Sequence, residues 1–356
     1  MAQSASLTVI VDFFVFDLVA LVIFDDIWII QMLLLSLLRY TFFLVFIGIS
    51  CQLQAQELRV EEELIPRESI DKDRLTALVV GGGTAYATSS ILLYETWYSR
   101  HPRRSFHFRD DWGQWGHTDK LGHVYSSYFQ TEWCADLFRW TGVSESKALL
   151  YGALSSSLFQ TTVEVMDGFS SEWGFSMSDI GANVIGTGTY LLQEKFWDDQ
   201  RIRWKYSVTP IDYQNTVGSD VRLQNRVDDL FGTGFFERGL KDYNAQTYWL
   251  SANLSSFFPD RSLPSWLNVA VGYGIGHTYG GYLNEWVDQG QLIRTDDDIH
   301  PRHAQFYLSL DADLSKVQVN SPFLRALLDV LNVLKVPFST IEVNTLGEVK
   351  LHLVRF

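Results

Sequence analysis

Three polar motifs lie within otherwise apolar segments of the chain: D-K-L-G-H at residues 119–123, E-V-M-D at 164–167 and D-I-G-A-N at 179–183. In each motif the outermost polar residues are three or four positions apart, so on a helix they share one face. Faces of this kind converge on one interior when the helices form a bundle. The sequence therefore predicts a polar cluster made of Asp119, Lys120, His123, Glu164, Asp167, Asp179 and Asn183.

The segments that carry these motifs have the apolar spacing and the punctuated ends of helices. We expect helices over residues 75–98, 119–141, 145–167 and 177–197. The first of them contains Glu95 as its single charged residue and is long enough to cross a bilayer. A buried core helix weakened by the glycines at 81–83 is the alternative interpretation, and we favour a helix in or at the edge of a membrane.

After about residue 205, short runs with partial alternation replace the helical periodicity and predict strands. The predicted strands cover residues 205–208, 246–256, 267–275, 304–314 and 341–356. An amphipathic helix is predicted at 322–334, because its apolar residues recur at helical spacing. The predicted fold class is therefore α+β: a membrane-associated bundle of about four helices, followed by a β-rich C-terminal region with one amphipathic helix.

The N-terminal residues predict a targeting segment for export. Read from Met1, the chain lacks the positive start of a signal peptide, because no Lys or Arg precedes Arg39. Read from Met32, it has one positive charge, an apolar core at 40–49 and a polar segment before the cleavage position that ends at Ala55. We therefore expect a signal peptide that begins near Met32 and is cleaved after Ala55.

Two alternatives for this region stay open. Residues 1–31 are either a mis-assigned start or a true N-terminal membrane span. Cys51 is a candidate for lipidation, although Gly48 stands where a lipidation motif prefers Leu. The expected organisation is a targeting region at 1–55 with the signal peptide at 32–55, a linker at 56–74, a helical unit at 75–204 and a β-rich region at 205–356.

Composition and charge restrict the partners of the protein. The net charge is −14 and the aromatic share is 15%. A nucleic-acid-binding protein normally has a basic surface, so we expect no nucleic-acid partner. Aromatic rings are favoured at membrane interfaces, and basic and aromatic residues alternate in the loop at 99–116. We expect membrane lipid as a partner, and an envelope protein as a further one. A loop that packs on the helices is the alternative interpretation of 99–116.

The polar cluster supports three interpretations. In the first, Lys120 or His123 pairs with a carboxylate and the cluster fixes the helix arrangement, since buried charges are costly unless paired. In the second, His123 is a catalytic acid or base, with Asp119 and Glu164 as further candidates. In the third, a divalent metal is bound, and the candidate ligands are His123, Glu164, Asp167 and Asp179. The sequence contains no phosphate loop, dinucleotide-binding motif or paired C-x-x-C, and we expect no cofactor.

Taken together, the motifs resemble the YfiM-like family of predicted periplasmic lipoproteins, a domain of unknown function. The family pattern is D-K-x-x-H, then K-E-x-x-D, then a W-S-x-x-D-x-x-x-D/N-x-x-G helix. This chain departs from the fullest charged form of that pattern at Val163 and Asn183. The long form of Bacteroidetes is also similar in the segments at 239–253 and 266–274. A fainter similarity links the order of polar residues to VanZ-like membrane proteins.

The resemblance implies a location in the cell envelope and supplies no enzyme class. We expect a membrane-associated envelope protein, periplasmic or at the outer membrane after signal cleavage, or in the inner membrane. Its polar cluster is expected to fix conformation or to bind a ligand without catalysis. The alternatives are an envelope hydrolase or transferase acting on a lipid or cell-wall intermediate, and a divalent-metal-binding protein.

Overall fold

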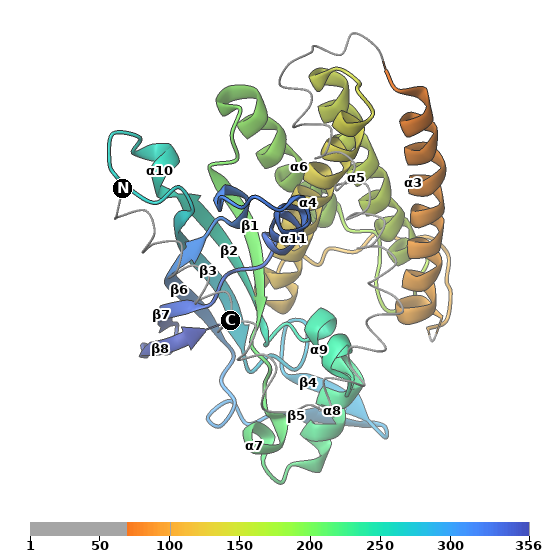
Figure 1. Ribbon diagram of the computed structural model, residues 1–356. Coiled ribbons are helices and arrows are strands. Elements are labelled where there is room, and N and C mark those ends of the chain that lie inside the picture. Colours follow the sequence, from red (N-terminus) through yellow and green to blue (C-terminus); the bar gives the residue numbers. More distant parts are fainter. Residues whose placement is uncertain (1–69, 100, 356) are drawn as a thin grey trace. The chain divides into compact units, whose positions relative to one another are not determined.

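The computed structural model describes residues 70–99 and 101–355, with the side chains of Phe235 and Phe236 left aside. Helices occupy the N-terminal half of the described part and an antiparallel sheet the C-terminal half (Figure 1), which confirms the predicted α+β class. The predicted signal peptide at 32–55, the segment 1–31 and Cys51 lie outside the described residues and stay predictions.

Four long helices form the helical part, as predicted. They are α3 (Lys72–Leu93), α4 (Thr118–Trp140), α5 (Glu145–Gly168) and α6 (Met177–Trp197). The first begins earlier than predicted because Asp71 caps it, accepting from the backbone nitrogens of Asp73 and Arg74 at 3.0 Å each. It continues into the π-helical turn η1 (Tyr94–Tyr98). The short helix η2 (Gln114–His117) leads directly into α4.

Glycines allow α4 to pack closely against α5 and α6. A Cβ atom on Gly152 of α5 would lie 2.7 Å from the backbone nitrogen of Ala135 in α4. A Cβ atom on Gly186 of α6 would lie 2.1 Å from Ser127 Oγ, also in α4. Without side chains at these positions the helix backbones can approach, so α4 contacts both neighbours and also touches the first strands of the sheet.

Six strands form the antiparallel sheet, in the order β1-β2-β3-β6-β7-β8. Their bounds are β1 (Ile202–Val208), β2 (Gln246–Asn253), β3 (Leu267–Gly276), β6 (His303–Ala312), β7 (Phe338–Asn344) and β8 (Val349–Arg355). A separate hairpin consists of β4 (Glu285–Asp288) and β5 (Gln291–Arg294). Trp249, Ala270 and Tyr307 form a buried cluster on this sheet.

The structure corrects several predicted boundaries. The predicted strand at 341–356 is two strands, β7 and β8, because the chain turns at Gly347 with a φ of 84°. The predicted strand at 246–256 ends at Asn253, whose side chain caps the short helix α10 (Leu254–Phe257). The predicted strand at 304–314 ends at Ala312, before the turn η3 (Leu314–Lys316).

The predicted amphipathic helix is α11 (Pro322–Leu331) and is shorter than the predicted range 322–334. It ends where the chain pairs with β1: Tyr206 donates its backbone N–H to Val333 O at 3.1 Å and accepts from Lys335 N at 2.9 Å.

After about residue 205 we predicted strands and a single helix, which is α11. The expectation of no other helix in this region was wrong. Three short helices, α7 (Tyr213–Val217), α8 (Val221–Phe231) and α9 (Phe235–Lys241), and the β4–β5 hairpin were not predicted. In α8, Leu223, Val227 and Phe231 are four residues apart and all buried. Three apolar residues at this spacing are too few to predict a helix from the sequence. The helix is stabilised by the packing of these side chains with Tyr213 and Tyr279.

Candidate functional site

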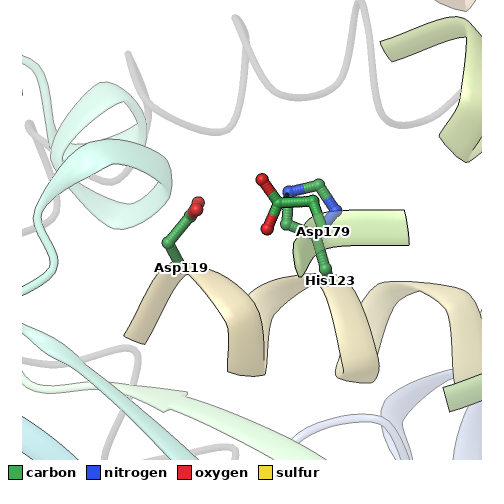
Figure 2. A group of neighbouring side chains, drawn as sticks. All are labelled: Asp119, His123 and Asp179. Atoms are coloured by element: carbon green, nitrogen blue, oxygen red, sulfur yellow. Dashed lines mark ion pairs between the residues drawn. The ribbon is translucent and has the colours of Figure 1, made fainter. Parts of the chain in front are cut away.

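The polar motifs meet at one place in the helical part. The first two turns of α4 carry Asp119, Lys120 and His123, the last two turns of α5 carry Glu164 and Asp167, and the start of α6 carries Asp179 and Asn183. Figure 2 shows Asp119 and His123 one turn apart on α4, with Asp179 of α6 reaching in beside His123.

Lys120 is the centre of the charged contacts. Its Nζ lies 2.8 Å from Asp111 Oδ1, 2.9 Å from Asp119 Oδ2 and 2.7 Å from Asp179 Oδ1. Only 6% of the side chain is exposed. Burial alone would lower the pKa of Lys120, but the carboxylates of Asp119 and Asp179 outweigh it and raise that pKa. The ammonium is therefore charged and compensated by three carboxylates.

His123 lies next to this group. Its Nε2 is 3.7 Å from both Glu164 Oε1 and Asp179 Oδ1, and its Nδ1 is 3.2 Å from Asn183 Oδ1. Because an amide oxygen only accepts, the imidazole donates to Asn183. Burial lowers the pKa of His123, but the neighbouring carboxylates, Asp119 first, raise it above its ordinary value. This shift favours the imidazolium, which is a poor starting state for a general base.

The carboxylates differ in their environments. Burial raises the pKa of Glu164 to about 8, although Glu164 Oε2 accepts from Ser176 N at 3.1 Å. Burial also raises the pKa of Asp179, to about 6. Burial acts on Asp111 in the same direction, but the hydrogen bonds from Lys120 and Ser176 outweigh it and lower the pKa. The site therefore contains both readily ionised and proton-holding carboxyl groups.

Asp167 is the one predicted member that does not contact this group directly. Its Oδ1 accepts from Tyr98 OH at 2.8 Å, which joins the end of η1 to α5. Burial raises the pKa of Asp167 to about 7. The structure thus brings six predicted residues together and places the seventh in a neighbouring contact.

Several members of the cluster were missed in the sequence. Asp111 lies in the loop before α4 and accepts from Ser176 Oγ and Ser178 Oγ at 2.6 and 2.8 Å. Tyr243 donates to Asp119 Oδ1 at 3.1 Å from a segment 124 positions away. Both residues belong to stretches noted above, the basic and aromatic loop at 99–116 and the segment at 239–253. No spacing rule connects them to the helical motifs, so the sequence did not point to them.

The geometry can hold a cation. Asp119, His123 and Asp179 each offer one ligand atom, and these atoms all lie within 4.8 Å of one another. The Lys120 ammonium already pairs with both of these carboxylates, so a bound cation would compete with Lys120 for them. Within the described residues, the buried atoms Glu164 Oε1 and Asn183 Nδ2 have no hydrogen-bond partner.

These observations define a class of protein: an α+β chain with a buried cluster of ion pairs held by three helices. Residues 107–195 match a family model described as "Predicted periplasmic lipoprotein (DUF2279)". The match contains all seven predicted cluster residues and confirms the YfiM-like resemblance over this range. It also agrees with a location in the cell envelope. Searches of curated proteins and of solved structures found no match.

Proposed function

We propose that the chain is a non-enzymatic cell-envelope protein that contacts a membrane, and that its polar cluster holds α4, α5 and α6 together. The observation that carries this proposal is the distribution of polarity. In the described part of the chain, many charged and amide side chains are buried while many large apolar side chains are exposed. A protein surrounded by water has the opposite tendency.

The outward faces of the helices support contact with lipid. On α5, Leu150, Leu154 and Leu158 recur every four residues, and more than half of each side chain is exposed. On α6, Val184 and Phe196 are about two-thirds exposed. The buried positions of the same helices hold the polar cluster. Large apolar patches on a surface mark contact with a protein or a membrane.

The sheet has the same reversed polarity. Val271, Leu308, Ile341 and Leu351 are cross-strand neighbours from β3 to β8 and are between 46% and 69% exposed. The residue next to Ile341 along β7, Glu342, is buried. Strands with an apolar outer face and a polar inner face are typical of sheets that contact lipid.

A candidate membrane span adds to this proposal. The helical stretch Lys72–Tyr98 has 27 residues and an apolar window with a mean hydropathy of 1.3, none of which is buried in the protein. Both its length and its exposure fit a helix that enters a bilayer.

The membrane proposal is tested by measuring which surfaces meet lipid. A nitroxide label is attached to single cysteines in a chain whose native cysteines are replaced by serine. The labelled variants are Leu154→Cys and Leu308→Cys, with Asp229→Cys as the control. The proteins are reconstituted into phosphatidylethanolamine and phosphatidylglycerol vesicles. We expect labels at 154 and 308 to collide with oxygen rather than with a water-soluble nickel chelate, and the label at 229 to do the reverse. Equal exposure of all three labels to the nickel chelate would refute membrane contact.

A second candidate function is binding of a hard divalent cation, favoured by the convergence of Asp119, His123 and Asp179. Such an ion has to displace the Lys120 ammonium from two of its carboxylates. Titration of the protein with Mn²⁺, followed by the electron paramagnetic resonance signal of the free ion, tests it. Binding that disappears in Asp179→Asn and persists in Asp229→Asn would support the metal function over the structural one.

A further inference from the structure

Three histidines gather at one end of the sheet, away from the polar cluster described above. His277 directly follows β3, and His303 begins β6 opposite Gly276 of β3. His300 lies in the loop before β6. The ring centroid of His277 is 5.5 Å from that of His300 and 5.3 Å from that of His303. His277 therefore packs against both of the other rings.

Buried polar atoms in this group lack partners. Within the described residues, His277 Nδ1, His300 Nδ1 and Tyr279 OH have no hydrogen-bond partner. His300 is 9% exposed and Tyr279 only 1%, and their rings are 5.8 Å apart. An unsatisfied buried polar group costs about 1–3 kcal/mol. Three such groups in one place indicate a site that is completed by a ligand.

His303 is oriented as a ligand would be. Its Nδ1 is 2.9 Å from the carbonyl oxygen of Pro301, which can only accept, so Nδ1 carries the proton. Nε2 then carries the lone pair and accepts from the amide nitrogen of Gln305 at 3.4 Å, so an ion that binds Nε2 replaces this hydrogen bond. Histidines that bind metals commonly donate their second N–H to a backbone carbonyl in this way. Gly276 leaves the space for the ring, because a Cβ atom there would lie 2.4 Å from His303 Cε1.

We propose that His277, His300 and His303 form a binding site for a divalent transition-metal ion of the Zn²⁺ type. Imidazole nitrogens are preferred ligands of such ions. Two imidazoles on one tetrahedral zinc ion hold their ring centroids about 5 Å apart, since each nitrogen lies about 2 Å from the ion. The observed centroid distances of 5.3 and 5.5 Å agree with this spacing. Three histidines leave a fourth position for water or another ligand.

Binding at this site requires the histidine rings to rearrange. Among the described residues, the group whose three ligand atoms lie within 4.8 Å of one another is Asp119, His123 and Asp179, so the histidine rings have to turn to bring their nitrogens around one ion. The two sites differ in chemistry, because carboxylates suit hard ions and imidazoles suit zinc, cobalt and nickel. This difference makes the histidine site testable independently of the proposed function.

The test is calorimetric titration of the full-length protein in detergent, purified with a tag that contains no histidine. We expect one Zn²⁺ per chain. His277→Gln, His300→Gln and His303→Gln should each weaken binding by about tenfold or more, as expected when the coordination of a metal is disturbed. His352→Gln is the matched control and should stay within about twofold of the wild type, because His352 does not belong to the proposed ligand set.

X-ray absorption of the Zn²⁺-loaded wild type keeps the proposal testable if the variants fold poorly. We expect the spectrum to show scattering from imidazole rings and to be fitted without a pair of carboxylate ligands. The proposal is overturned if the wild type binds no Zn²⁺, if the spectrum shows carboxylate ligands with one imidazole, or if His123→Gln abolishes binding while His277→Gln leaves it intact.

Discussion

Lys120 carries a full positive charge at a place that solvent hardly reaches. Three carboxylate oxygens lie 2.7, 2.8 and 2.9 Å from its Nζ. Tyr243 donates to Asp119 Oδ1, the oxygen that Lys120 does not contact, and Ser176 donates to Asp111 Oδ1, which Lys120 also contacts. A buried group of this kind is stable only while it is complete, because removing one charge leaves the others unpaired.

Lys120→Met should therefore destabilise the protein strongly. We expect a loss of about 3–5 kcal/mol in the free energy of unfolding, the range for breaking a buried ion pair. Lys147→Met on the exposed face of α5 is the control and should change stability by less than about 0.5 kcal/mol. Denaturant unfolding in detergent, followed by circular dichroism, measures both. Equal stability of the two variants would show that the cluster does not hold the helices.

Glu164 makes the stability depend on pH. Its pKa is about 8 in the folded protein and its ordinary value is 4.5. The folded state therefore holds a proton that the unfolded state releases between these values, so this contribution to stability is lost as the pH rises from about 4.5 to 8. Glu164→Gln cannot lose a proton.

We expect the stability of Glu164→Gln relative to the wild type to rise between pH 5 and pH 9 by at least about 1.4 kcal/mol, the free energy of one pKa unit. The exposed variant Asp229→Asn is the control for replacing a carboxylate by an amide. Thermal unfolding at a series of pH values makes the comparison, and parallel curves for Glu164→Gln and the wild type would contradict the assignment.

At the scale of elements, glycine decides how near α5 and α6 come to α4. Their distance determines whether Glu164 and Asp179 reach the side chains of α4, since ion pairs weaken quickly with separation. Gly186 and Gly188 lie in the same helix but differ in surroundings. A Cβ atom at Gly186 would lie 2.1 Å from Val124 O, whereas a Cβ atom at Gly188 would meet nothing within 4 Å.

Gly186→Ala should cost about 1–3 kcal/mol through overpacking. Gly188→Ala should stabilise the helix by up to about 1 kcal/mol, since alanine has the higher helix propensity. Unfolding midpoints in the same detergent give both values. If Gly186→Ala is as stable as Gly188→Ala, the close approach of α4 and α6 is not required for the fold.

In the described part as a whole, exposed apolar faces occur together with buried polar side chains on both the helices and the sheet. Ser309 and Glu342 are buried in the sheet, while Leu308 and Ile341 beside them are exposed. A one-residue shift in register would exchange these two sets. The register between β6 and β7, which pairs Leu308 with Ile341, therefore determines which face is apolar.

Lysine substitutions separate the two faces. The triple variant Val271→Lys, Leu308→Lys and Ile341→Lys should keep the wild-type circular dichroism spectrum, because its side chains point outward, and should float less with lipid vesicles. Ser309→Lys on the inner face should prevent folding, since an unpaired charge would be buried. Unchanged flotation of the triple variant would exclude the sheet from the membrane-contacting surface.

Much of the helical part could be predicted because its signals are local. Asp119 and His123 share a face through the geometry of one helix turn, and Ser176 begins α6 by accepting from Asp179 N at 3.1 Å. The short helices α7 and α8 between β1 and β2 could not be predicted, because their few apolar residues become informative only when they pack together with Tyr279.

Residue spacing along the chain predicts the four helices, the faces on which the polar motifs lie, and the α+β class. These features depend on local spacing, because the spacing of residues along a helix determines on which face their side chains lie. The folded chain shows in addition that Asp111, Asp119 and Asp179 share Lys120, that Tyr243 joins them, and that His277 packs against His300 and His303. These contacts join segments far apart in the sequence, so they depend on how the helices pack and on the register of the strands.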